Sequence, residues 1–193
     1  MKSQRKVDDF ILYGIAAAQQ AFVDGKTAAI LFAVLALGVL EGVLPLHFAE
    51  RLSQAQIGGL YVGASVLVAA CAAAAGGMRP RPLVFAAVPL AVAGTSLGGL
   101  AADVPIWLLA LALAAVGIGL ANSGSLGLLV EAVPVERIVT AMVVWSQIGI
   151  VGYLLGPLAG GIVADRLSYE FVGMVSAAAG LLLLALLRTP ARH

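Results

Sequence analysis

Long apolar runs separated by short charged segments dominate the pattern along this chain. Six runs approach or exceed the roughly 20 residues that a helix needs to cross a hydrocarbon core of about 30 Å. Because backbone groups in lipid must form hydrogen bonds within their own segment, each run is predicted to be a helix. The six predicted spans are 28–48, 58–77, 83–102, 105–130, 141–163 and 171–187. We therefore expect an all-α membrane protein whose transmembrane domain occupies residues 28–187.

The two ends of the chain differ from the apolar runs. Residues 1–27 carry mixed charges, and apolar residues recur loosely at helical spacing between residues 8 and 26. This pattern favours an amphipathic helix lying on the membrane interface over a seventh span. We expect residues 1–27 to form a cytoplasmic linker and residues 188–193 to form a cytoplasmic tail.

Composition supports the membrane interpretation. Hydrophobic residues make up 62% of the chain and charged residues only 11%, whereas soluble domains carry about 25% charged residues. A soluble fold of this length lacks the interior volume to bury so much apolar surface. Lipid is therefore the expected surroundings of most of the chain.

The positive charges are divided unequally between the two predicted sides of the membrane. When alternate loops are assigned to opposite sides, nine of the 11 Lys and Arg residues fall on the side of the N-terminus, and Arg51 and Arg166 fall on the other. Cytoplasmic segments of membrane proteins are enriched in Lys and Arg. We therefore expect both termini to lie in the cytoplasm and the protein to lie in the plasma (inner) membrane.

Several classes of function are disfavoured by what the sequence lacks. It has no glycine-rich phosphate-binding loop ending in Lys-Ser or Lys-Thr, so nucleotide hydrolysis is not expected. The two histidines, His47 and His193, cannot form a paired metal site. The single cysteine, Cys71, has no second cysteine with which to bind a metal and is expected to pack within an apolar helix. We expect no enzyme activity, no cofactor, no metal and no nucleic-acid partner.

The fifth predicted span carries the most specific motif. Gly152, Gly156 and Gly160 are spaced four apart and so share one helix face, which would let a neighbouring helix approach closely. Pro157 lacks a backbone donor and can kink a helix. The motif favours either tight packing or a hinge, and its candidate residues are Gly149, Gly152, Gly156, Pro157, Gly160 and Gly161.

An acidic residue lies within the first predicted span. Glu41 comes 14 residues after Thr27, which corresponds to roughly 20 Å along a helix and places Glu41 beyond the membrane midplane. Acids within the membrane are costly and usually face a cavity or a polar partner. Glu41 is therefore either a partner for a polar group on a neighbouring helix or a cavity acid that binds substrate or a proton. Further cavity candidates are Tyr61, Asn122, Trp145, Gln147 and Tyr153.

Three segments of the chain resemble the major facilitator superfamily, and more narrowly its drug-efflux branch. The stretch from Gly152 to Gly161 is similar to the glycine-proline motif of antiporters in that family. The stretch from Leu40 to Ser53 resembles the opening helix of the family's C-terminal half. Pro134, Glu136 and Arg137 resemble the cytoplasmic loop before the glycine-proline helix.

The resemblance implies a specific architecture and activity. Members of this family have twelve helices in two halves, so this chain resembles one six-helix half. The first, second, fourth and fifth helices would line a central cavity. The implied function is secondary transport of small amphipathic molecules by alternating access, with efflux and proton coupling as the finer expectations.

One departure and two alternatives accompany this expectation. The loop at residues 76–81 keeps basic residues but lacks the acid that the family often carries there. The second half could come from another chain, a missing N-terminal half or a second copy, which would make a homodimeric half-transporter. A different class of function is a membrane protein that does not transport, either a truncated remnant or a subunit that binds a partner.

Overall fold

The structure, a computed structural model, describes residues 38–39 and 41–188. The predicted interfacial helix between residues 8 and 26 lies outside these residues, as does most of the first predicted span. Residues 38–39 and 41–42 are helical and lead into a short helix, α3 (Leu44–Phe48).

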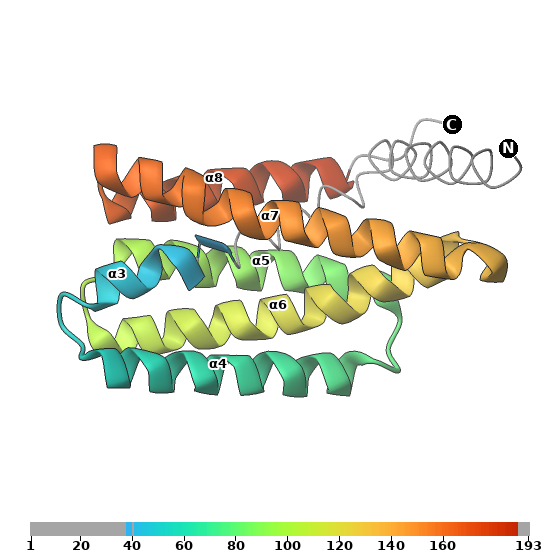
Figure 1. Cartoon of the computed structure of the whole chain (residues 1–193), viewed down its shortest axis with the longest axis horizontal. Helices are drawn as coiled ribbons and strands as arrows, with labels where there is room; N and C mark the ends of the chain where they lie inside the picture. The colour runs from blue at the N-terminus through green and yellow to red at the C-terminus, as the bar shows by residue number, and fades with distance from the viewer. Residues whose placement is uncertain (1–37, 40, 189–193) are drawn as a thin grey trace, which may run out of the picture.

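Six further helical elements follow α3 (Figure 1). They are α4 (Gln54–Ala75), α5 (Pro80–Leu100), α6 (Val104–Ala132), the short 3-10 helix η1 (Val135–Arg137), α7 (Ile138–Arg166) and α8 (Tyr169–Arg188). The described residues contain no strand. The predicted all-α class is therefore confirmed for this part of the chain.

Within the described residues, four segments are long and apolar enough to cross a membrane, namely α4, α5, α6, and α7 together with η1. They correspond to the second to fifth predicted spans. The first span lies largely outside the described residues, and α8 is not among the four. Six spans therefore stays a prediction.

The second predicted span starts a few residues later than the observed helix because polar residues cap the helix start. α4 begins at Gln54 rather than at residue 58, since Ser53 and Gln56 form a capping box. The Ser53 backbone N–H donates to Gln56 Oε1 at 2.9 Å, and the Gln56 backbone N–H donates to Ser53 Oγ at 3.4 Å. Such reciprocal bonds satisfy donors that the first turn leaves free. An apolar run alone does not reveal them.

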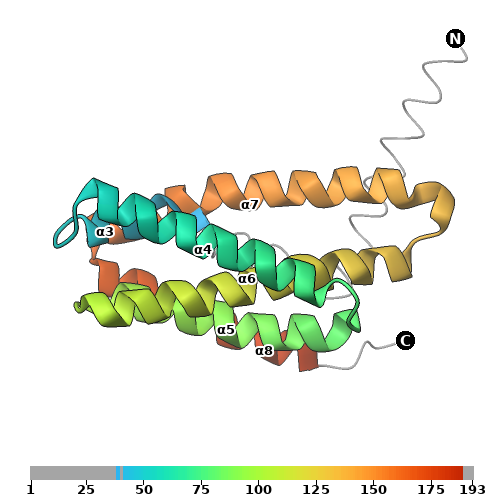
Figure 2. The ribbon, with the colours of Figure 1, turned by 90° about the horizontal axis from the view of Figure 1, so that it is seen from below.

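Successive long helices run antiparallel (Figures 1 and 2). The helix connections at or beside Arg79 and Arg137 therefore lie at one end of the bundle, and those at or beside Arg51 and Arg166 lie at the other. This arrangement agrees with the alternation used to assign positive charges to two sides. It does not establish which side faces the cytoplasm.

The core of the bundle forms where α6 packs between α4 and α5, and α5 also packs against α8. Small residues make the α5–α6 approach close, because a Cβ added at Gly117 would lie 2.5 Å from the backbone nitrogen of Ala91. The largest buried side chains include Trp107, Phe48 and Leu44. The end of the first span is thus anchored in the core.

Aromatic residues join four segments at the end of the bundle opposite Arg79. Trp107 Nε1 donates a hydrogen bond to the carbonyl of Ala101 at 2.7 Å, and His47 Nε2 lies 3.2 Å from the same oxygen. The His47 ring stacks on Tyr169 with centroids 4.5 Å apart, and Phe48 packs against Trp107 at 4.6 Å. This aromatic junction fixes the end of the first span against α6 and α8.

Candidate functional site

The described end of the first span meets α7 at a contact centred on Gly38, Gly42 and Pro157. A Cβ added at Gly38 would lie 3.0 Å from Gly156 Cα, and one added at Gly42 would lie 2.5 Å from Pro157 Cβ. Real Cβ atoms rarely or never come that close to other atoms. The two helices therefore approach one another as closely as they do only because Gly38 and Gly42 lack side chains.

The glycines of the α7 motif divide between two environments. Gly152, Gly156 and Gly160 are buried, and a Cβ added at Gly160 would lie 2.9 Å from Val43 Cγ2. A Cβ added at Gly149 or Gly161 would meet nothing within 4 Å. The structure thus places the three glycines that are spaced four apart on the packed face of the helix.

Pro157 removes one backbone hydrogen bond of α7 at this contact. α7 continues through Pro157 without a break, but proline has no N–H to donate to the carbonyl four residues earlier, which belongs to Tyr153. A Cβ added at Gly38 would lie 3.1 Å from that carbonyl oxygen. This geometry supports the packing interpretation of the motif, and a hinge stays a prediction.

Glu41 forms a hydrogen bond across the same contact. The hydroxyl of Tyr153 on α7 donates to Glu41 Oε2. Hydrogen bonds to an ionised carboxylate are stronger than those between neutral groups. The predicted polar partner on a neighbouring helix therefore exists, although Glu41 itself is exposed in this chain rather than buried.

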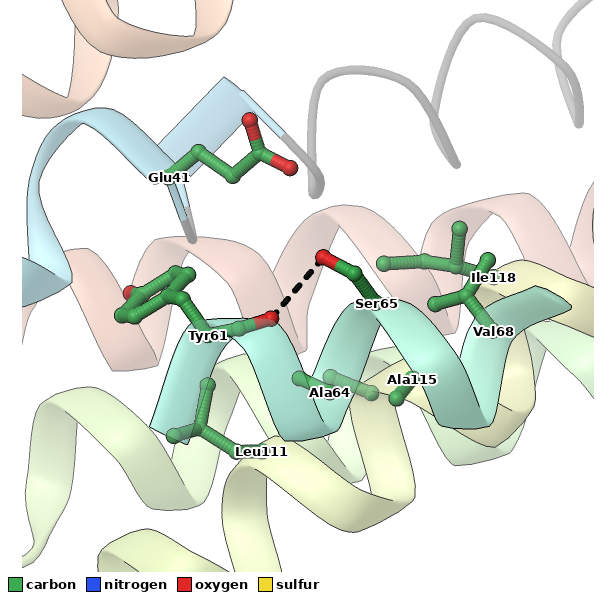
Figure 3. Close-up of a pocket in the computed structure, with 9 residues that line it drawn as sticks. Glu41, Tyr61, Ala64, Ser65, Val68, Leu111, Ala115 and Ile118 are labelled. Atoms are coloured by element: carbon green, nitrogen blue, oxygen red, sulfur yellow. Dashed lines mark hydrogen bonds between the residues drawn. The ribbon is translucent and has the colours of Figure 1, made fainter. Parts of the chain in front are cut away.

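Glu41 also lines a small pocket between the first span, α4 and α6 (Figure 3). Its side chain extends over the turn of α4 that carries Tyr61 and Ser65. The Ser65 hydroxyl donates to the Tyr61 carbonyl at 2.8 Å within the same helix. The remaining lining residues are small or apolar: Ala64, Val68, Leu111, Ala114, Ala115 and Ile118.

This combination of groups suits an amphipathic ligand. A carboxylate can accept hydrogen bonds or pair with a positive charge, and tyrosine rings can contact cations and apolar groups. Pockets for small molecules are typically apolar with a few polar groups that fix orientation. Among the described residues no group of three His, Cys, Asp or Glu side chains could hold a metal ion.

The other predicted cavity residues lie elsewhere. Trp145 Nε1 on α7 donates to Ser125 Oγ on α6 at 3.3 Å, and the Ser125 hydroxyl donates to the carbonyl of Asn122 at 3.2 Å. Gln147 is exposed on α7. The Glu41 pocket is lined by none of the residues Asn122, Trp145 and Gln147. The structure therefore brings together Glu41, Tyr61 and Tyr153, and it places the other three apart from them.

Sequence reasoning missed several residues of the site. Gly38 and Gly42 are spaced four apart, like the glycines of α7, so the signal for a close contact was present in the first span. Val68, Leu111 and Ile118 line the pocket, but they resemble many other apolar residues of membrane helices. No local pattern could have distinguished them.

A known protein family matches most of the chain. The model of the Major Facilitator Superfamily matches residues 27–193. The chain belongs to this superfamily. Membership supports a multi-pass membrane protein that acts as a secondary transporter of small molecules. None of the curated proteins searched matches the chain.

The glycine contact leads to a prediction about stability. Gly42→Ala should lower the free energy of unfolding of the purified protein by about 1–3 kcal/mol, because the added methyl group would be too close to Pro157. Its melting temperature should fall accordingly. Gly161→Ala is the matched control, since its methyl group enters open space. Thermal unfolding in one detergent compares the two variants. Equal melting temperatures for both would contradict a packed contact between Gly42 and Pro157.

Proposed function

We propose that this chain is one six-helix half of a secondary transporter that exports small amphipathic molecules by alternating access. The observation that carries the proposal is the position of Glu41, which is exposed next to an apolar pocket and accepts a hydrogen bond from Tyr153 on the glycine-proline helix. In this superfamily fold, two bundles rock about a site near the membrane midplane.

Polar groups that the described residues leave uncovered support the proposed second half. Glu41, Ser65 and Tyr153 are exposed, and none of the most apolar window of α4 is buried. A carboxylate facing hydrocarbon costs several kcal/mol unless water or a partner covers it. A second bundle facing the first span and α4 would enclose Glu41 in a wet cavity.

The lining of the pocket also favours a class of substrate. The carboxylate of Glu41 favours molecules with a positive charge or a hydrogen-bond donor, and the apolar residues on α4 and α6 favour a hydrophobic body. The same carboxylate could carry a proton, which would couple export to the proton gradient. Efflux and proton coupling are supported by the resemblance of the α7 motif to that of antiporters.

The source of the second half separates the alternatives. A neighbouring reading frame that encodes six more helices would indicate a split transporter. Crosslinking of the purified protein into dimers would instead support a homodimer. A protein that never transports, whatever its partner, would be a remnant or a partner-binding subunit.

Replacing Glu41 tests the proposed site. In vesicles that contain the assembled protein, Glu41→Gln should reduce uptake of fluorescent lipophilic amines about tenfold or more, because a hydrogen bond to a charged group contributes about 1.5–3 kcal/mol. Glu136→Gln, which alters an exposed carboxylate in η1, should leave uptake unchanged. Wild-type uptake by the Glu41→Gln protein would rule out a role for this carboxylate in transport.

The proposed orientation has its own test. In a Cys71→Ala background, Ala49→Cys and Gly77→Cys place single thiols at exposed positions at opposite ends of the bundle. A membrane-impermeant maleimide should label Ala49→Cys in intact cells and label Gly77→Cys only after the membrane is opened. The reverse pattern would show that the loop before Arg79 is extracellular and the termini are not cytoplasmic.

A further inference from the structure

We propose that Tyr153 is a positioning residue that couples the state of Glu41 to the position of α7. This inference rests on the transport function proposed above and adds a mechanical link within one half. The link consists of the Tyr153–Glu41 hydrogen bond and the glycine-proline contact one helical turn away.

The two parts of the link lie within one turn of each helix. On α7, Tyr153 and Pro157 are four residues apart and so share a face. On the first span, Glu41 is adjacent to Gly42, which contacts Pro157. Tyr153 contributes twice, since its hydroxyl donates to Glu41 and its carbonyl faces Gly38. A change at Glu41 therefore acts directly on the residue that borders the helix contact.

α7 is otherwise held loosely within the described part of the chain. It contacts α6 and α8 much less extensively than α5 contacts the same two helices, and many of its large apolar side chains are exposed. Its other side-chain hydrogen bond to a neighbouring helix, among the described residues, is the one between Trp145 and Ser125. Loss of the Tyr153–Glu41 bond would thus remove one of the few directional contacts that α7 makes.

The physical basis of the coupling is the charge on the acceptor. A hydrogen bond to an ionised group contributes about 1.5–3 kcal/mol, and one between neutral groups contributes about 0.5–1.5 kcal/mol. A proton from water that binds the Glu41 carboxylate, or a cationic substrate that pairs with it, weakens the acceptor that Tyr153 uses. What then remains between the helices is packing alone, of Pro157 against Gly38 and Gly42 and of Val43 against Gly160. Such packing sets the helix separation but provides no directional bond, so α7 can shift along it.

Distance measurements on the purified full chain test this inference. In a Cys71→Ala background, nitroxide labels at Ala74 on α4 and Val139 on α7 occupy exposed positions. Two variants remove the bond: Glu41→Gln keeps the side-chain shape and removes the charge, and Tyr153→Phe keeps the ring and removes the hydroxyl. Each should shift or broaden the distance distribution between the labels by about 2 Å or more, the scale of helix shifts in switching proteins. Glu170→Gln is the matched control and should change nothing, because it removes a charge from an exposed position of α8 that does not line the pocket.

The double variant separates coupling from a merely structural role. If Tyr153 acts through Glu41, the variant that combines Glu41→Gln with Tyr153→Phe should give the same distance distribution as either single variant. The reason is that the effects of two substitutions that remove one shared interaction do not add. Additive shifts, or a wild-type distribution for Tyr153→Phe, would overturn the inference. A melting temperature close to that of the wild type would show that each variant is folded.

The outcome for coupling is distinguishable from the outcome for transport. The distances are measured on the purified chain and require no substrate movement. Shifted distances in a chain that fails to transport would leave the coupling intact and reject the proposed function. If the distances do not shift in Tyr153→Phe but uptake is lost in Glu41→Gln, the coupling is rejected and the proposed transport function stands.

Discussion

The close approach of the first span to α7 is the constraint on which the site depends. Gly38 and Gly42 present no side chains to Pro157 and Gly156, so the two helices can pack nearly backbone to backbone. Interfaces of this kind are typical of membrane helices, for which association depends on packing rather than on hydrophobic burial. At this separation the side chain of Glu41 reaches the hydroxyl of Tyr153. A bulkier residue at either glycine would move the acid away from its partner.

The aromatic junction at one end of the bundle complements this contact. His47, Phe48, Trp107 and Tyr169 hold the end of the first span against α6 and α8. The described end of the first span is therefore anchored against α6 and α8, while α7 packs against it at the glycine-proline contact. This division gives the bundle a firmly packed part and a helix that depends on few directional contacts.

Helix positions and the packed face of α7 could be predicted because they depend on local patterns. Apolar runs predict spans, and the spacing of Gly152, Gly156 and Gly160 predicts a shared face, which the structure shows as buried. The pairing of helices could not be predicted in the same way. Glu41 and Tyr153 are 112 residues apart in sequence, and no local rule selects Tyr153 over Trp145 or Gln147 as its partner. The family resemblance predicted which helices line a cavity, but not which side chains meet there.

The exposure of Glu41 bears on how a complete protein is organised. A carboxylate in the apolar part of a membrane helix is tolerated only where water, a charge or hydrogen-bond donors compensate for lost hydration. The hydroxyl of Tyr153 supplies one donor, whereas a carboxylate offers about four acceptor sites. The Glu41 side chain also borders the pocket on α4 and α6. An exposed carboxylate beside an apolar pocket is consistent with the proposed cavity shared with a second bundle.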